Sequence, residues 1–181
     1  GLGARLDAMG YGSATTPSAG TLAPMSAVKY STAPAVGSAT YVHAAIAQTA
    51  GTQTITTGIT NPDYPRIVTI KGNASGNSGN VVITGTDIAN AVLTETIALN
   101  GATEVLGTKA FKTVVSIALP AEVHAGTDTV SIGVGNKIGF PIAIPNAGVV
   151  LVKTFDNAVD SSTITASATL ALSLAAPAGT F

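Results

Sequence analysis

The residues that could take part in catalysis or metal binding are few and far apart in this sequence. His43 and His124 are widely separated, and neither has a neighbour at the spacing of a metal-binding pair. We therefore expect an ordinary strand histidine and an ordinary loop histidine. Glu95 and Glu104 flank a predicted hairpin and could approach each other across it. Paired carboxylates can hydrolyse glycosides in an aromatic-lined cleft, but this chain has no Trp and only four Phe.

Three local patterns resemble binding motifs, and each has a simpler interpretation. The run Gly133–Gly139 is glycine-rich like a phosphate-binding loop, but Phe140-Pro141 follows where such a loop would start a helix. We predict a turn between strands there. The run 73–75 matches an N-glycosylation acceptor, which matters only in a eukaryotic secretory protein. Asp87 and Asp128 lack the ladder of acidic residues of a dedicated calcium site. The sequence thus predicts no catalytic residue, metal or cofactor.

The most distinctive local string is Asn61-Pro-Asp-Tyr-Pro-Arg66. Its two prolines fix the backbone, and Asp63 can accept local hydrogen bonds. The string therefore predicts a rigid corner from which Arg66 opens a strand. A second interpretation is a docking corner that exposes Tyr64 and Arg66 to a partner, because such residues often anchor interfaces.

The chain is unusually poor in charge. Charged residues make up 9% of its 181 residues, against about 25% in typical proteins. The net charge of −1 gives no basic surface for nucleic acid, and no apolar run is long enough to cross a bilayer. The absence of cysteine excludes disulfides and thiolate metal sites. Because little charge would keep free monomers apart, we expect other chains to cover much of this surface.

Composition divides the sequence into an arm and a domain. Residues 1–45 are rich in Gly, Ala, Ser, Thr and Pro and show no hydrophobic periodicity, which predicts an extended N-terminal arm or, alternatively, a disordered tail. Spaced apolar residues favour an arm that becomes ordered against a partner. The predicted partner interface comprises Leu2, Met9, Tyr11, Met25 and Tyr30 of the arm, together with Tyr64 and Arg66.

Residues 46–181 form the predicted domain, in which apolar and polar residues alternate as in half-buried strands. The predicted strands are 41–49, 53–57, 66–71, 80–84, 91–99, 103–106, 109–119, 128–134, 141–144, 149–154 and 162–174. The clearest are 109–119, with Phe111, Val115, Ile117 and Leu119 on one face, and 162–174. Asn100-Gly101 predicts a hairpin turn. Many short strands without a convincing helix indicate an all-β fold, an antiparallel β-sandwich or jelly roll.

Several of these strings resemble virion structural proteins of tailed bacteriophages, most closely capsid decoration (cement) proteins. The strings are Ile59–Arg66, Val68–Gly76, Val82–Ile88, Glu95–Gly101, Gly107–Pro120 and Asp128–Pro141. The resemblance implies a non-enzymatic protein that binds the outer surface of the major capsid lattice and stabilises the phage head. It would be made in the bacterial host cytoplasm. Its partners would be the major capsid protein and copies of itself, as a homo-trimer, with no nucleic acid, membrane or cofactor.

Two other functions are compatible with the same sequence. A tail-tube, tail-fibre or neck component would have equally low charge and Thr-rich strands. A bacterial surface adhesion module is a third possibility, although the first ten residues lack the layout of a signal peptide and aromatic residues are scarce.

Overall fold

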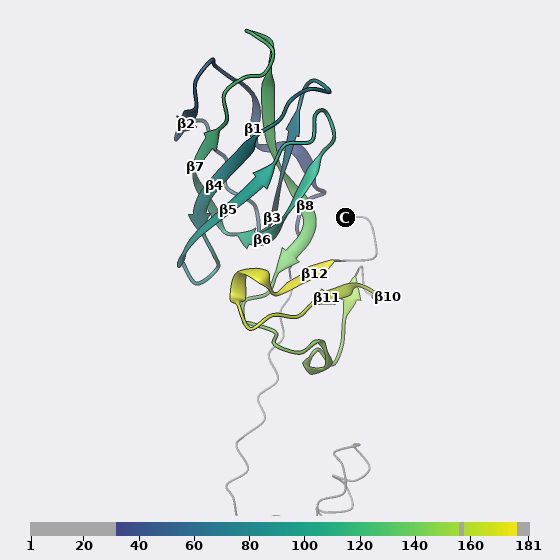
Figure 1. The fold of residues 1–181 in the computed structure, drawn as a ribbon. Coiled ribbons are helices and arrows are strands. Elements are labelled where there is room, and N and C mark those ends of the chain that lie inside the picture. Colours follow the sequence, from purple (N-terminus) through teal and green to yellow (C-terminus); the bar gives the residue numbers. More distant parts are fainter. Residues whose placement is uncertain (1–31, 156–157, 177–181) are drawn as a thin grey trace, which may run out of the picture.

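The computed structural model describes residues 32–155 and 158–176, and its regular structure is almost entirely β (Figure 1). The predicted antiparallel β-sandwich is confirmed. Residues 1–31 of the predicted arm lie outside the described residues. The boundary predicted after residue 45 falls within the first strand, β1 (Ser38–Ala47), so the last residues assigned to the arm are already part of a sheet.

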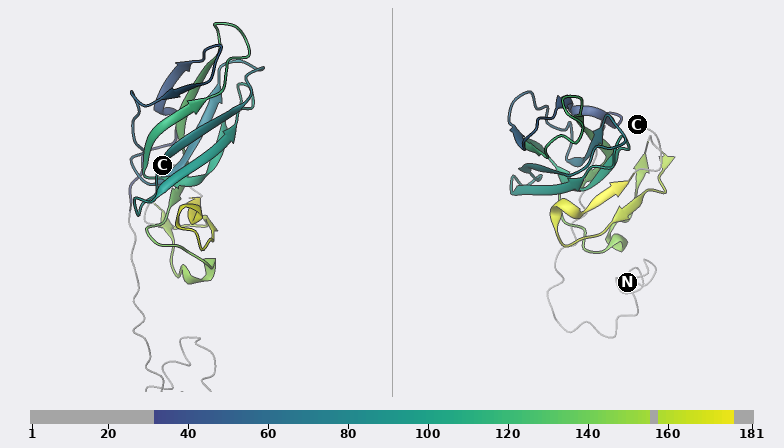
Figure 2. Two further views of the ribbon diagram at one scale, coloured as in Figure 1. Left: turned by 60° about the vertical axis from the view of Figure 1, so that its left-hand side comes forward. Right: turned by 45° about the horizontal axis from the view of Figure 1, so that its top comes forward.

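Two antiparallel sheets form the layers of the sandwich (Figure 2). The smaller sheet has the strand order β2 (Gln53–Ile55), β7 (Thr113–Leu119), β4 (Asn80–Thr86) and β5 (Val92–Ala98). The larger has the order β11 (Thr163–Thr165), β12 (Leu174–Ala176), β8 (Thr129–Gly139), β3 (Arg66–Gly72) and β6 (Val105–Phe111), and β1 also pairs with β8. The long strand β8 therefore has β3 along one edge and β1, then β12, along the other.

The main core lies between the sheets, and β3 is buried on both faces. Val68 and Ile70 point into the main core, whereas Ile67 packs with Ala110 and Leu174 in a second, smaller cluster. The main cluster consists of Val42, Ile46, Val68, Ile70, Val81, Ile83, Ile97, Leu99, Phe111, Val114, Ile117, Leu119, Val130, Ile132 and Val134. Because Leu174 belongs to β12, the smaller cluster ties the C-terminal part of the chain to the sandwich.

The C-terminal lobe, the described part of residues 140–176, lies beyond one end of the sandwich (Figure 1). It contains β11, β12, the hairpin of β9 (Thr154–Phe155) with β10 (Ala158–Val159), and two 3-10 helices, η1 (Ala147–Val149) and η2 (Leu170–Leu172). The predicted strand 141–144 does not form, and only the end of 149–154 is a strand. In the part of the chain that the structure describes, no helix is long and apolar enough to span a membrane.

The predicted single strand 162–174 is wrong. Thr163 pairs with Ala176, so the segment reverses direction between β11 and β12. The buried Ser173 is the physical cause: its hydroxyl donates to the carbonyls of Ser167 at 2.8 Å and Thr169 at 3.2 Å. Such side chain–backbone hydrogen bonds compete with a sheet ladder. These hydrogen bonds close a turn that the alternation of apolar and polar residues did not predict.

The predicted strand 109–119 is divided between the two sheets. The chain bends at Lys112, leaving β6 in the larger sheet and starting β7 in the smaller one. The prediction that Val115 faces the core is also wrong, since its side chain is exposed while Val114 is buried. A register shift in the β4–β7 pairing skips Val115. A bulge of this kind inverts the alternation of side chains beyond it.

Two predicted turns differ from the structure. Gly133–Gly139 is the second half of β8 and not a turn, because its glycines allow other chain segments to approach closely: an added Cβ at Gly135 would lie 2.8 Å from the Ile67 side chain. Asn100-Gly101 does form a tight turn, with Gly101 at φ +58 and Asn100 bridged to Thr103. The strands that it joins, however, enter different sheets.

Glu95 closes the corner where β5 and β6, the edges of the two sheets, meet. β6 bulges between its pairings of Leu106 and Ala110, and the buried Glu95 carboxylate accepts hydrogen bonds from the amide of Thr108 at 2.6 Å and its hydroxyl at 2.8 Å. The Lys109 ammonium donates to the Thr94 carbonyl on β5 at 2.7 Å. Charged side chains thus bind edge groups that could otherwise pair with another chain.

Replacing Glu95 with glutamine should lower the free energy of unfolding by about 1–2 kcal/mol, because one acceptor oxygen becomes a donor beside backbone amides. Glu104→Gln is the matched control, because Glu104 is exposed and accepts one hydroxyl hydrogen bond, from Thr69. The free energy of unfolding of this variant should fall by no more than about 0.5 kcal/mol. Urea unfolding of both variants measures the difference. Equal losses would contradict the role assigned to Glu95.

Candidate functional site: the anchor of the N-terminal segment

The loop between β2 and β3 crosses from one sheet to the other and closes the end of the sandwich nearest the C-terminal lobe. The amide of Thr60 donates to the carbonyl of Val42 on β1 at 2.8 Å. The side-chain oxygen of Asn61 accepts from the amide of Val114 at 2.9 Å, within the β7 bulge. The predicted rigid corner of residues 61–66 is therefore confirmed, and its polar groups bind strands of both sheets.

Arg66 is the centre of this corner, and its side chain is completely buried. Its Nε donates to the Gly135 carbonyl at 2.7 Å. Its Nη1 donates to the Ala35 carbonyl at 2.8 Å and to Asp63 Oδ1 at 3.0 Å. The β3–β8 register shifts between Arg66 and Val68, so Gly135 lies in a bulge. The guanidinium thus supplies a hydrogen-bond donor to a carbonyl inside the bulge, where the regular ladder is interrupted.

The same ion pair holds both backbone groups of Ala35. The amide of Ala35 donates to Asp63 Oδ2 at 2.7 Å, while its carbonyl accepts from Arg66. Two residues later, the amide of Gly37 donates to Asn136 Oδ1 at 2.9 Å. We name these five residues, Ala35, Gly37, Asp63, Arg66 and Asn136, the segment anchor. They fix the point at which residues 1–31 join the domain.

The electrostatics of Asp63 match this arrangement. Partial burial alone would raise the pKa of its carboxyl. The hydrogen bonds from the Ala35 amide and from Arg66, the positive charge of Arg66 and the Tyr64 amide outweigh burial, and they hold the pKa of Asp63 below its ordinary value of 3.8. The Asp63 carboxylate therefore remains ionised at neutral pH.

The predicted interface residues divide into three groups. Leu2, Met9, Tyr11, Met25 and Tyr30 lie outside the described residues. Tyr64 is half-buried and lines a shallow hollow of about 400 Å³ with Pro62 and Lys112. The prediction of a docking corner that exposes Arg66 is wrong. The Arg66 guanidinium is buried and donates hydrogen bonds to carbonyls of residues that are distant in the sequence. Sequence reasoning did not find Asn136, whose only signal was its position in the glycine-rich run.

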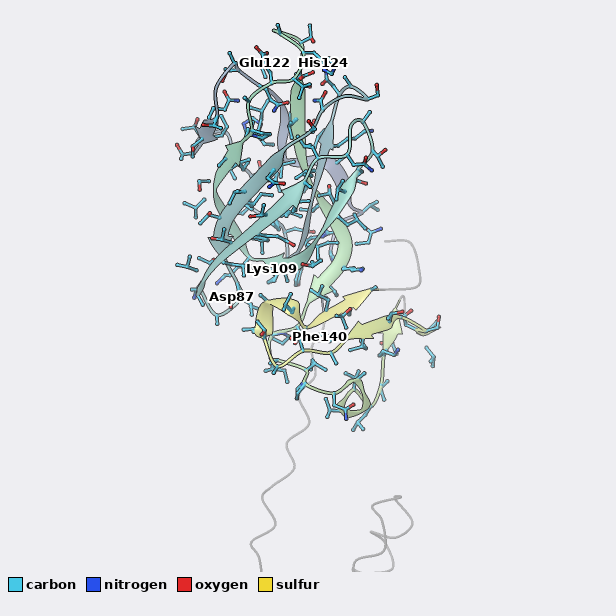
Figure 3. The ribbon with its side chains drawn as sticks, in the orientation of Figure 1. Asp87, Lys109, Glu122, His124 and Phe140 are labelled. Atoms are coloured by element: carbon cyan, nitrogen blue, oxygen red, sulfur yellow. The ribbon has the colours of Figure 1, made fainter. Side chains whose placement is uncertain are left out.

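The structure does not bring the candidate catalytic residues together. His43 Nδ1 lies 2.8 Å from the adjacent Ala44 carbonyl, whereas His124 Nδ1 lies 2.8 Å from Asp128 Oδ1. Figure 3 shows His124 and Asp87 at opposite ends of the sandwich. Each aspartate binds amides of its own loop. Within the described ranges, no group of three or more His, Asp or Glu side chains could hold a metal ion.

Comparison of the chain with known protein families, with curated proteins and with solved structures finds no match. The candidate site is therefore defined by its own geometry. The segment anchor is a built polar site, because a fully buried cation and a carboxylate hold the backbone of a single residue from both sides.

Asp128 predicts a measurable pH dependence at the opposite end of the sandwich. Burial would raise its pKa, but the hydrogen bonds from the amide and ring of His124 and from the Val123 amide, together with the charge of His124, lower its pKa below 3.8. A carboxyl whose pKa is lower in the folded state stabilises the fold above its unfolded pKa. That stabilisation is lost as the pH falls through the folded value.

We therefore expect Asp128→Asn to be less stable than the wild type at pH 7, and the difference in stability to narrow as the pH falls below the ordinary aspartate pKa of 3.8. Thermal unfolding of both proteins from pH 7 downward measures this difference. Parallel stability curves would contradict the assignment.

Proposed function

We propose that this protein is a non-enzymatic structural protein of a tailed-phage virion that binds the outer surface of the major capsid lattice as a decoration protein. The segment anchor is the observation that carries this proposal. It holds Ala35 on both backbone groups, so the start of the described chain is fixed on the domain. The resemblance of residues 55–145 to such proteins supports the same function.

A fixed exit point matters mechanically. When a segment binds a lattice, it can hold the attached domain in place only if the junction between segment and domain is itself rigid. Buried polar groups make this junction stiff, and an extended segment can add backbone hydrogen bonds along the sheet edge of a neighbour. The anchor thus suits a protein that fastens a compact domain to a surface.

The outer face of the smaller sheet also supports an assembly role. Its outward-facing positions carry only small or uncharged side chains in β2, β4, β5 and β7. They are Thr54, Asn80, Val82, Thr84, Thr86, Val92, Thr94, Thr96, Ala98, Thr113, Val115, Ser116 and Ala118. A face without charge approaches another protein at little electrostatic cost. Contact between copies in a trimer is part of the proposal.

The test uses purified capsids of the phage that encodes this protein, stripped of it, and two forms of the chain. The full chain should bind the capsids, and a form lacking residues 1–31 but retaining Ala35 should bind at least about a hundredfold more weakly, because two or more buried apolar anchors are lost. Unchanged binding would refute the role of the segment. Immunogold label on the tail of the virion would overturn decoration in favour of a tail or neck component.

A further inference from the structure

The C-terminal lobe leaves an unusual amount of apolar surface uncovered. Five of its large apolar side chains are about half exposed or more: Ile142, Val149, Leu151, Val152 and Val159. We name these five residues the lobe patch. Leu151, Val152 and Val159 have exposed fractions of 78%, 77% and 91%. Val159 pairs with Thr154, and the Asp160 amide donates to the Lys153 carbonyl, so Val159 lies beside the chain that carries Leu151 and Val152.

The lobe is too small to bury these side chains itself. Its buried apolar residues are Ile144, Ala171 and Leu174, and the last of these packs on the sandwich. Small units bury a smaller fraction of their surface than large ones. A cluster of exposed apolar side chains on a soluble surface typically marks a contact site. The lobe patch therefore needs a covering chain.

Residues 1–31 of this chain have the composition that such a contact needs. They contain only three charged residues, Arg5, Asp7 and Lys29, and spaced large apolar side chains, namely Leu2, Leu6, Met9, Tyr11, Leu22, Met25, Val28 and Tyr30. An apolar patch next to few charges pairs best with a segment that also carries few, since no charge has to be desolvated.

The position of the segment anchor places these residues within reach of the lobe. Ala35 is bound through Arg66 to Gly135 of β8, and β12 of the lobe pairs with the same strand at Ile138 and Gly139. The described chain therefore begins at the end of the sandwich that bears the lobe (Figures 1 and 2). Thirty-one extended residues span up to about 100 Å, which is ample for the lobe of the same or a neighbouring copy.

We propose that residues 1–31 dock on the lobe patch and complete the core of the C-terminal lobe. Apolar side chains of the segment cover Leu151, Val152 and Val159, and the anchor sets the start of its path. This inference describes the protein free in solution, before the segment binds a capsid, and it does not depend on the virion role. It is tested on the isolated protein, so its failure and the failure of capsid binding are separate results.

The absence of cysteine allows a direct test in the full chain. Leu151→Cys introduces a single thiol on the lobe patch, to which a benzophenone photo-cross-linker is attached. Val123→Cys, at an exposed position on the loop after β7, is the matched control. Mass spectrometry should map the Leu151→Cys cross-links to residues 1–31 and should find no such cross-links from Val123→Cys. The proposal is overturned if the Leu151→Cys cross-links reach only residues outside 1–31, or if no cross-links form.

The gel mobility of the cross-linked product tells which copy supplies the segment. A monomeric product shows docking within one chain, and a dimeric or larger product shows docking between copies. Both support the assignment of residues 1–31 as the occupant.

Trypsin provides an independent readout because Lys29 lies within the docking segment. Leu151→Ser/Val152→Ser should raise the rate of cleavage after Lys29 by about tenfold or more, since two apolar contacts are lost. Val123→Ser, which removes an exposed valine from the loop after β7, should leave the rate unchanged. Equal rates in Leu151→Ser/Val152→Ser and the wild type would overturn the proposal.

Discussion

Replacing Arg66 with methionine is expected to lower the free energy of unfolding by about 3–5 kcal/mol. Methionine fills much of the same space but donates no hydrogen bond. The carbonyls of Gly135 and Ala35 would each lose a donor, and Asp63 would lose its counter-charge. An unpaired buried polar group costs about 1–3 kcal/mol, so the losses add to a large fraction of the stability of an ordinary domain.

Urea unfolding measures this change, and Lys71→Met is the matched control. Lys71 lies on the same strand and is exposed, so the control should change stability by no more than about 0.5 kcal/mol. For a domain of this size, the loss of unfolding free energy in Arg66→Met corresponds to a fall in Tm of about 10 °C. Equal effects of the two substitutions would show that the guanidinium contributes nothing beyond an ordinary surface charge.

The burial of Arg66 shows why the sequence identified the corner but not its role. The two prolines of the string 61–66 predict a rigid turn, because proline restricts the backbone locally. The partners of the guanidinium are Ala35 and Gly135, which lie 31 and 69 residues away. Nothing in the local pattern shows that these carbonyls converge, and an arginine at the start of a strand is ordinarily exposed.

The strands of the sandwich were predictable wherever one face is buried and the other exposed. β4 and β5 alternate along their whole length, so their predicted positions agree with the structure to within two residues at each end. β3 is buried on both faces and could be found only as a short apolar run between turn signals. In the lobe the alternation of 162–174 predicted one long strand, because a pattern of side chains cannot show that Ser173 binds its own backbone.

Three of the bulges around the core explain where a charge-poor chain uses its polar side chains. A bulge frees backbone groups from the ladder, and burial makes those groups costly unless they find partners. Arg66 binds the freed carbonyl in β8, Glu95 binds the freed amides in β6, and Asn61 binds the Val114 amide in β7. Two of the few charges in this sequence therefore hold the interior together, which leaves still fewer on the surface.

Gly133→Ala is expected to destabilise the protein by about 2–4 kcal/mol, because it overpacks two backbones against each other. An added Cβ would lie 2.2 Å from the Ser38 carbonyl oxygen and 2.5 Å from the Ala39 Cα. Backbone atoms cannot move aside as the end of a flexible side chain can. The start of β1 would have to move away from β8. Gly37, whose amide binds Asn136 three residues along β8 from Gly133, would be displaced with it.

Gly51→Ala is the control, since an added Cβ there meets no atom within 4 Å. That variant should be neutral or more stable by up to about 1 kcal/mol, because alanine restricts the unfolded chain. Thermal and urea unfolding compare the two, and amide hydrogen exchange at Gly37 reports on the anchor itself. Exchange should accelerate in Gly133→Ala and stay unchanged in Gly51→Ala. If Gly133→Ala has the same free energy of unfolding as the wild type and the Gly37 amide is still protected from exchange, the close packing of β1 against β8 does not position the segment anchor.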